Sequence, residues 1–127
     1  MILPCGLCLQ AGLGIIDTVK FCGCDVSTVV MGCAASMGAV IASSGTKGKR
    51  YIGPNAEMMI HQALGGTSGQ TADIIRTAQH IEKVNRRLYG ILAANSGVSI
   101  QQIAVDCDRD YHLNAEESIS YGLVDCI

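Results

Sequence analysis

An uncharged run of small and apolar residues at positions 26–46 limits the possible folds more than any other feature of this chain. It is long enough for a membrane helix, which needs about 20 apolar residues. However, its first third is rich in β-branched residues and its remainder in alanine, with glycines and hydroxyl side chains throughout. This change of pattern predicts a buried strand at 26–31, a turn at 32–35 and a packed helix at 37–44. Ser36, at the junction, is then either a small packing residue or a nucleophile.

Length and composition set further bounds. The 127 residues are enough for one domain with an apolar core, so we expect a single domain over residues 1–127. The net charge of −2 and the dispersed lysines and arginines provide no broad basic surface for nucleic acid. The first residues lack the basic segment of a signal peptide, so export is not expected.

The seven cysteines allow two interpretations. An odd number without an export signal favours reduced thiols in an intracellular protein over a disulfide framework. Cys5-x-x-Cys8 and Cys22-x-Cys24 would suggest zinc, but structural zinc sites normally use two pairs of comparable spacing. We therefore expect small buried hydrophobes rather than metal ligands.

Helical and strand patterns alternate along the rest of the chain. The most regular segment is 71–95, where apolar residues recur at steps of three and four. A helix of this length in a small domain must bury its apolar stripe, so association with another copy is a hypothesis. The other predicted elements are a helix at 11–21, a Gly45 cap after helix 37–44, a strand at 56–60, a helix capped by Ser99 and Gln102 that ends near 106, a helix capped by Asn114 and Glu117 that ends at Gly122, and a strand at 123–125. This alternation indicates an α/β fold with a largely parallel sheet.

Two predicted strands lead to candidate catalytic side chains, Ser36 and His61. Functional groups gather at the carboxyl ends of strands in open α/β sheets. A serine hydroxyl needs a base within hydrogen-bond reach and a third group to orient that base. Of the other histidines, His80 falls inside the long helix and His112 follows an acidic cluster. Spacing does not choose the acid among Asp106, Asp108 and Asp110. The residues thus indicate a Ser/His/acid hypothesis, while purely structural roles stay open.

A series of motifs runs in order from about Ala11 to the C-terminus. The motifs are Gly32-Cys-Ala-Ala-Ser-Met-Gly-Ala39, Lys47-Gly-Lys-Arg50, Met59-Ile-His-Gln62, Leu64-Gly-Gly66, Gly69-Gln70, Asp108-Arg-Asp110 and Tyr121-Gly-Leu-Val-Asp125. Together they resemble the Clp protease proteolytic subunit (ClpP) family. Agreement among several separate motifs is far more specific than one match around a serine.

The resemblance implies a serine peptidase with the ClpP/crotonase-like fold, assembled as two stacked heptameric rings. It also implies a role for each matching position: Ser36 as nucleophile, His61 as general base and Asp110 as the acid that orients the histidine. The backbone amides of Met37 and Gly6 would form the oxyanion hole.

The chain departs from the family pattern near its start. The family's Ser-Pro-Gly-Gly turn aligns with Pro4-Cys-Gly-Leu7, so Leu7 stands where the family has its second glycine. Ala63 replaces the proline that usually follows His-Gln. The chain begins at this turn, and we expect it to be N-terminally truncated relative to the family.

The sequence therefore predicts an ATP-dependent Clp-type serine endopeptidase subunit that cleaves unfolded polypeptides inside a ring-shaped chamber. The resemblance implies no metal or organic cofactor, because a separate AAA+ unfoldase partner would use the ATP. It implies a homo-oligomer in the cytoplasm, or in an organelle matrix or stroma. Loop 62–69 and helix 71–95 resemble the handle that joins the two rings in the family. The alternatives are a catalytically impaired structural subunit of a Clp ring and a crotonase-like acyl-CoA enzyme.

Overall fold

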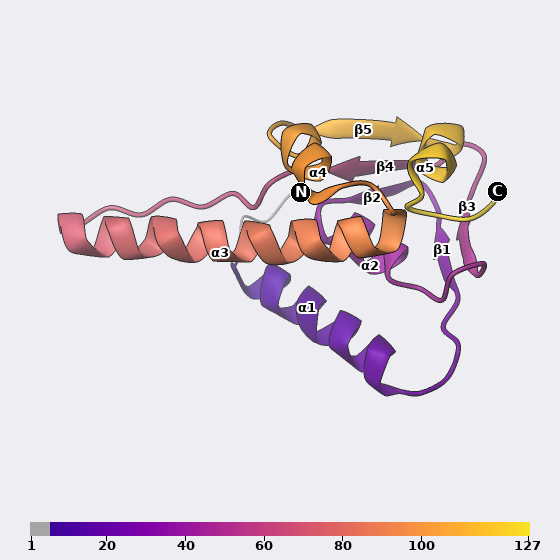
Figure 1. The fold of residues 1–127 in the computed structure, drawn as a ribbon, viewed down its shortest axis with the longest axis horizontal. Coiled ribbons are helices and arrows are strands. Elements are labelled where there is room, and N and C mark those ends of the chain that lie inside the picture. Colours follow the sequence, from indigo (N-terminus) through magenta and orange to yellow (C-terminus); the bar gives the residue numbers. More distant parts are fainter. Residues whose placement is uncertain (1–5) are drawn as a thin grey trace.

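The computed structural model describes the backbone of residues 6–127 and the side chains of residues 9–127. Helices and strands alternate for much of the chain, as the hydrophobic periodicity predicts (Figure 1). The elements are α1 (Gly6–Phe21), β1 (Thr28–Val30), β2 (Cys33–Ala35), α2 (Met37–Ser43), β3 (Arg50–Ile52), β4 (Glu57–Ile60), α3 (Thr71–Ser96), α4 (Ile100–Asp106), β5 (Tyr111–Asn114) and α5 (Ala115–Tyr121).

The strands form two small sheets in place of the largely parallel sheet expected. Strand β1 pairs with β3 in parallel, and β4 lies between β2, its parallel neighbour, and β5, its antiparallel neighbour. The predicted strand at 26–31 ends at Val30, because Gly32 turns the chain with φ of 74°. The residues predicted as a turn, 32–35, instead contain strand β2. The α/β class is confirmed, but the long apolar run contains two strands rather than one.

Several other boundaries also differ from the prediction. Helix α1 begins at Gly6 rather than near residue 11. Helix α2 is capped by Ser44 and not by Gly45. A Cβ at Gly45 would lie 2.7 Å from Thr28 Oγ1, so this glycine permits close packing. The predicted strand at 123–125 is wrong, since the only pairing there is an isolated bridge between Tyr51 and Cys126.

The predicted helix caps near the C-terminus are largely confirmed. Asn114 and Glu117 form a reciprocal capping box, and α5 ends at Gly122 with φ of 86°. Ser99 caps α4 by accepting a hydrogen bond from the Gln102 amide, whereas the Gln102 side chain donates to Asp106. Only one half of the second predicted capping box therefore forms.

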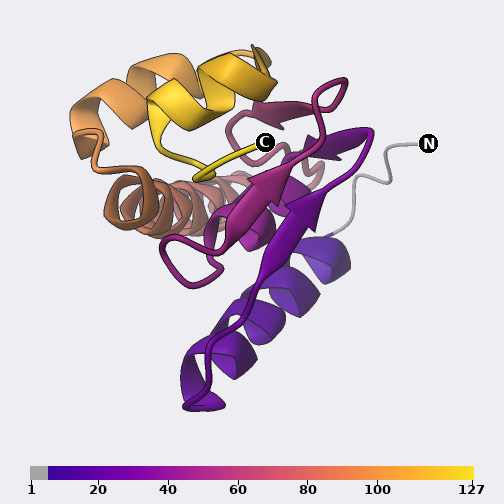
Figure 2. The same cartoon turned by 90° about the vertical axis from the view of Figure 1, so that its right-hand side faces the viewer.

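The core lies where α2 packs between the strands and the C-terminal half of α3 (Figure 2). Its largest fully buried apolar side chains are Ile16, Ile52, Met58, Ile60, Leu92, Ile103, Leu123 and Val124. Within the described part of the chain, no helix is both long enough and apolar enough to cross a bilayer. Since the apolar run at 26–46 is divided among β1, β2 and α2, it is not a spanning helix.

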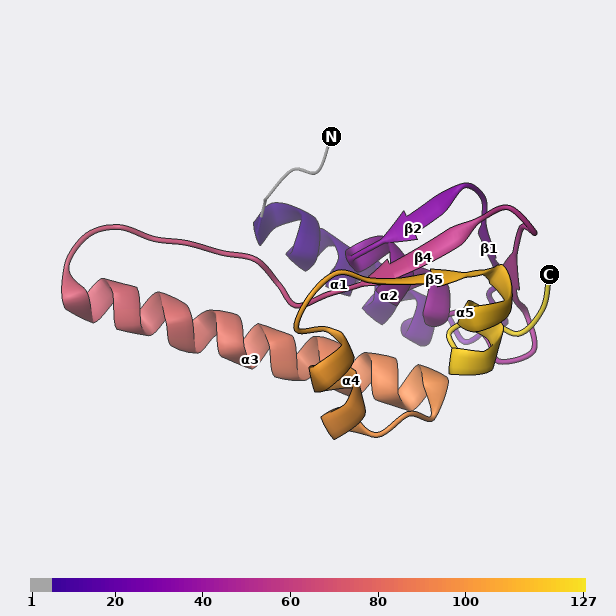
Figure 3. The same cartoon turned by 90° about the horizontal axis from the view of Figure 1, so that it is seen from above.

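Helix α3 extends well beyond this core, and the segment after His61 runs outward alongside it to the far tip, where α3 begins (Figures 1 and 3). Of its 26 residues, Leu88 and Leu92 are the buried ones, both in its second half. The preceding loop contacts the helix closely, because the Ala63 amide donates to Asn85 Oδ1 at 2.6 Å. A Cβ at Gly65 would lie 2.6 Å from Ile81 Cδ1. The loop and the projecting half of α3 therefore form one arm.

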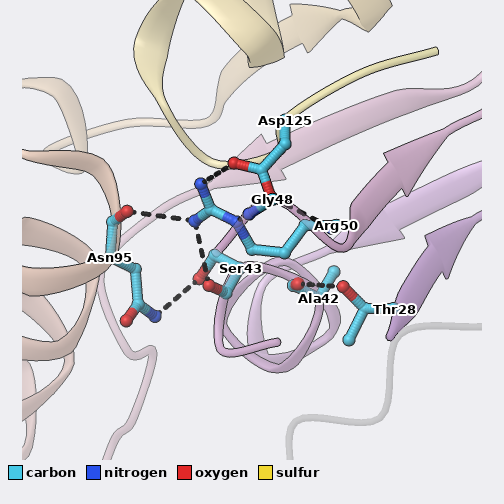
Figure 4. A network of polar contacts seen from close by, with 7 residues as sticks. All are labelled: Thr28, Ala42, Ser43, Gly48, Arg50, Asn95 and Asp125. Carbon is cyan, nitrogen blue, oxygen red and sulfur yellow. Dashed lines mark hydrogen bonds and ion pairs between the residues drawn. The ribbon is translucent and has the colours of Figure 1, made fainter. Parts of the chain in front are cut away.

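A buried ion pair joins segments that are distant in sequence (Figure 4). The Arg50 guanidinium is 2% exposed and donates to both carboxylate oxygens of Asp125, with Nη2 to Oδ1 at 2.6 Å and Nε to Oδ2 at 2.9 Å. Its Nη1 donates to the carbonyls of Ser43 and Asn95. The hydrogen bonds from the Arg50 side chain outweigh burial and lower the pKa of Asp125 to about 2. The pair links β3, α2, α3 and the C-terminal segment.

Candidate active site

Ser36 lies at a sharp turn between β2 and α2. Its φ of 56° and ψ of −120° make it the one non-glycine residue with positive φ among residues 6–127. Such a conformation costs about 1–3 kcal/mol and persists only where the surroundings impose it. Here the Ser36 amide donates to Met59 O at 2.8 Å, and the Ser36 carbonyl accepts from Ala39 and Val40. The turn therefore presents the hydroxyl at the end of the strand.

His61 directly follows β4, and the parallel pairing of β4 with β2 brings it beside Ser36. Its Nε2 lies 2.8 Å from Ser36 Oγ, and its side chain is 10% exposed. Its Nδ1 lies 3.1 Å from Asp110 Oδ1. An ionised Asp110 only accepts hydrogen bonds, and with that carboxylate His61 would carry its proton on Nδ1 and accept from the serine hydroxyl through Nε2. This tautomer is the one that can remove a proton from Ser36.

Strand register selects Asp110 among the three candidate acids. Ile60 pairs with Tyr111 in the antiparallel β4–β5 ladder, so the residues that flank this pair, His61 and Asp110, are neighbours. Asp106 instead accepts hydrogen bonds from Tyr121 and Gln102. The structure thus brings together Ser36, His61 and Asp110, although Asp110 stays 63% exposed.

The remaining histidines lie elsewhere. His80 is exposed on the projecting part of α3, and the Nδ1 of His112 is 4.0 Å from Glu57 Oε1. Neither has a described hydrogen bond to Ser36 or Asp110. The geometry therefore places His61 beside Ser36, as the sequence predicts, and neither of the other two histidines.

The two predicted oxyanion donors differ in how they are placed. The Met37 amide is the first of α2, where amide groups have no acceptor within the helix. Gly6 is the first residue of α1 rather than part of a turn, while Pro4 and Cys5 lie outside the described residues. A Cβ at Gly12 of α1 would overlap Met37 Cγ, so α1 packs directly against the start of α2.

Two hollows adjoin the Ser36–His61 pair. One is an apolar cavity of about 20 Å³ lined by Leu9, Ser36, Met37, Val40, Ile60, His61, Ala63, Leu88 and Leu92. The other, of about 410 Å³, is polar and lined by His61, Gln62, Leu64, Asp108, Arg109 and Asp110. A hollow of about 320 Å³ near β1 and α2 does not include the three candidate catalytic residues. The larger hollow is thus bordered by His61 and Asp110, whereas Ser36 lines only the small apolar one.

Sequence reasoning missed the residues that hold the segment after His61. The Gln62 amide donates to Cys107 O at 2.7 Å, and its side chain donates to Asp108 O at 2.9 Å. Asn85 accepts from the amide of Ala63. The sequence did contain a sign of the last contact. Asn85 is a polar residue between Val84 and Leu88 in the apolar stripe of the long helix, where a polar side chain indicates an internal hydrogen bond.

The cysteines do not all follow the prediction of small buried hydrophobes. Cys107 is buried, and its burial raises its pKa to about 12. Cys22, Cys24 and Cys33 are exposed free thiols, so the prediction is wrong for them. Among the described residues, no group of three or more histidine, cysteine or acidic side chains is placed to hold a metal ion.

Comparison with known proteins gives a consistent result. The family model of Clp protease matches residues 4–127. The chain is 56% identical over 119 residues to the ATP-dependent Clp protease proteolytic subunit of Streptococcus pyogenes serotype M5 (strain Manfredo). The corresponding proteins of serotype M3 (strain SSI-1) and serotype M1 give the same identity. Each alignment covers 92% of this chain and 61% of the relative, so the chain spans about three fifths of their length. With nearly its whole length matched, this chain belongs to the Clp protease family.

Proposed function

We propose that this chain is a serine-type endopeptidase subunit of the Clp type, with Ser36, His61 and Asp110 as its catalytic residues. The observation that carries the proposal is the continuous hydrogen-bonded series from Ser36 Oγ to His61 at 2.8 Å and on to Asp110 at 3.1 Å. It occurs in a chain of the Clp protease family. The family match does not favour an acyl-CoA enzyme.

In the proposed reaction, Ser36 Oγ attacks the peptide carbonyl carbon while His61 Nε2 takes the hydroxyl proton. Asp110 holds the imidazole through Nδ1–H and stabilises its positive charge. The Met37 amide, with Gly6 as its proposed partner, donates to the oxyanion, and one such donor typically contributes about 3–4 kcal/mol. His61 then protonates the leaving amine. Water, deprotonated by His61, attacks the acyl-enzyme and releases Ser36.

These steps require no metal or organic cofactor. The relatives are named ATP-dependent, and we propose that a separate AAA+ unfoldase uses the ATP and delivers unfolded polypeptides. The site residues adjoin the ends of β2, β4 and β5, and the open hollow beside His61 and Asp110 suits an extended chain rather than a folded protein. The proposed setting is the cytoplasm or an organelle matrix or stroma.

Hydrolysis of an apolar fluorogenic peptide and labelling by a serine-directed phosphonate test the proposed nucleophile. Ser36→Ala should lower kcat/KM about a thousandfold or more and abolish labelling, because the attacking oxygen is removed. Ser120→Ala is the matched control, since Ser120 is exposed on α5 and only donates to Glu116 O. Activity that survives in Ser36→Ala would contradict the proposal. A wild-type chain with neither activity nor labelling would favour a non-catalytic subunit.

We further propose that the arm made by the loop after His61 and the projecting half of α3 joins copies of this chain. Leu64, Ile74 and Ile75 are large apolar side chains exposed on this arm. An apolar stripe without a partner in its own chain is typical of an interface. The family resemblance implies two stacked heptameric rings.

Molar mass in solution tests this assembly. Wild-type chain should sediment as an oligomer, and Ile75→Asp should shift it towards smaller species because a charge would be buried at the contact. Ile100→Asp is the matched control, since Ile75 and Ile100 are both 51% exposed but Ile100 lies outside the arm. A stable wild-type monomer, or equal effects of the two substitutions, would overturn the proposed interface.

A further inference from the structure

Two exposed cysteines lie together at the end of α1. Cys22 continues the last turn of the helix, with its amide donating to Thr18 O at 3.0 Å. Gly23 has a φ of 65°, a conformation that glycine adopts readily, and it turns the chain back towards the helix. As a result, Cys24 Sγ donates a hydrogen bond to Cys22 Sγ at a distance of 3.3 Å. Both residues are exposed.

Neither core packing nor metal binding accounts for the close approach of Cys22 and Cys24. A Cβ at Gly23 would meet nothing within 4 Å, so the turn is open to solvent rather than packed. Among the described side chains, no group of three or more histidine, cysteine or acidic residues is placed to hold a metal ion, so the two thiols are not part of a metal site. The turn lies past the end of α1, at an outer corner of the molecule, apart from β2, β4 and β5 (Figures 1 and 2). The proposed peptidase chemistry does not use it.

We infer that Cys22 and Cys24 form a redox-active dithiol, which a small disulfide such as oxidised glutathione converts reversibly to an intramolecular disulfide. The sulfur atoms must approach from 3.3 Å to the bonded distance of about 2 Å. Because both side chains are exposed, rotation about their side-chain bonds meets little steric resistance. This inference is independent of the proposed peptidase function.

The environment favours Cys22 as the attacking thiol. Hydrogen bonds from the Cys24 backbone and then from its thiol lower the pKa of Cys22. The hydrogen bond to Cys22 raises the pKa of Cys24. Since the thiolate is the nucleophile, Cys22 reacts first and Cys24 second. Cys33, on β2, provides a contrast, because partial desolvation and then the charge of Glu57 raise its pKa.

The exchange has two balanced steps. The Cys22 thiolate attacks one sulfur of oxidised glutathione, which forms a mixed disulfide and releases one glutathione thiolate. The Cys24 thiolate then attacks Cys22 Sγ, which forms the Cys22–Cys24 bond and releases the second glutathione thiolate. The two protons lost by the cysteines end on the two glutathione thiols. The protein is oxidised by two electrons, glutathione is reduced by two, and excess reduced glutathione reverses both steps.

Thiol labelling after equilibration in glutathione buffers tests the inference. The purified chain is held at several ratios of oxidised to reduced glutathione, quenched in acid, labelled with a maleimide and digested with trypsin. Cleavage after Lys20 and Lys47 gives peptide 21–47, which contains Cys22, Cys24 and also Cys33 as an internal reference. Under oxidising conditions this peptide should lack two hydrogens and carry one maleimide, on Cys33. Labelling of the pair should fall about tenfold and return with reduced glutathione.

Single substitutions assign the steps. Cys24→Ser should accumulate a glutathione adduct on Cys22, because the resolving thiol is missing. Cys22→Ser should react more slowly, and Cys33→Ser, the matched control, should leave the Cys22–Cys24 disulfide unchanged. Circular dichroism verifies that each variant is folded. Three maleimides on peptide 21–47 at every ratio would overturn the inference, as would a bond from Cys22 to Cys33 or to a second chain.

Discussion

At the residue scale, Ser36 combines a positive φ with a position at the junction of β2 and α2. The Ser36 amide and carbonyl are both held by hydrogen bonds, the first to a neighbouring strand and the second to the helix that follows. These contacts offset the strain of a positive φ and fix the direction of the hydroxyl. In the proposed reaction, the hydroxyl then needs only a base to take its proton, which His61 provides when Asp110 accepts from its Nδ1.

Asp110→Asn should lower kcat/KM of peptide hydrolysis by about a hundredfold to ten-thousandfold. The amide can donate to His61 Nδ1, which would favour the tautomer with a proton on Nε2 and prevent it from accepting from Ser36. Asp108→Asn is the matched control. It removes a neighbouring exposed carboxylate whose side chain has no described hydrogen bond to His61. Equal losses in the two variants would indicate a general charge effect and not a positioning role.

At the element scale, α1 packs against Met37, the first residue of α2, whose amide is the proposed oxyanion donor. Gly12 permits this contact, because any side chain there would overlap the Met37 side chain. Two residues further along the same helix, Gly14 has open space around its missing Cβ. The helical pattern at 11–21 predicted the element, but the different roles of its glycines depend on the partner helix.

Gly12→Ala should destabilise the fold by about 1–3 kcal/mol, because the added methyl forces Met37 to move. Since Met37 follows Ser36, kcat of peptide hydrolysis should fall with it. Gly14→Ala should instead raise stability by about 0.5–1 kcal/mol, because alanine loses less backbone entropy in a helix. Urea unfolding and peptide hydrolysis measure both effects. Indistinguishable behaviour of the two variants would contradict the proposed contact.

At the scale of the whole molecule, the buried Arg50–Asp125 pair joins segments that local sequence does not connect. The two residues are separated by 75 positions, and Arg50 also binds the C-terminal half of α3 through Asn95 O. Arg50 ends the short basic run Lys47-Gly-Lys-Arg50, a charge pattern from which a solvated turn is expected. The structure corrects this, since its guanidinium is among the most buried side chains described.

Asp125→Asn should lower the free energy of unfolding at neutral pH by about 3–5 kcal/mol, because it leaves Arg50 buried and without its carboxylate. Asp25→Asn is the matched control. It removes an exposed pair with Lys49 and should change stability by less than about 1 kcal/mol. Urea unfolding at neutral pH compares them, and similar small losses would contradict a structural role for the buried pair.

The same pair predicts an acid dependence. The folded-state pKa of Asp125, about 2, lies below its ordinary value of 3.8, so ionised Asp125 stabilises the native state. This contribution, about 2 kcal/mol, is present above pH 4 and is lost as the pH falls towards 2. Asp125→Asn should remove that part of the slope in urea unfolding between about pH 4 and pH 2. An unchanged slope would rule out the pair as its source.

Local sequence was enough to predict the elements that depend on interactions between residues close together in the chain. Period-3.6 apolar spacing predicted the long helix at 71–95, and side-chain caps predicted the ends of α5, because these interactions join residues three or four positions apart. His61 was singled out because it follows the predicted strand at 56–60, and Ser36 because it lies at the predicted strand-to-helix junction, although β2, the strand directly before Ser36, was predicted as a turn. The motif resemblance indicated the family, which the comparison with Clp protease confirmed.

Tertiary structure decided what depends on contacts between distant positions. Only the β4–β5 register places Asp110 beside His61, 49 positions away, because spacing alone treats the three acids alike. Only packing buries Arg50 with Asp125 and leaves Cys22 and Cys24 exposed and adjacent. Hydrophobic periodicity predicts which face of its own helix or strand a residue occupies. Which residue it meets depends on how the elements pack, and that is a property of the whole chain.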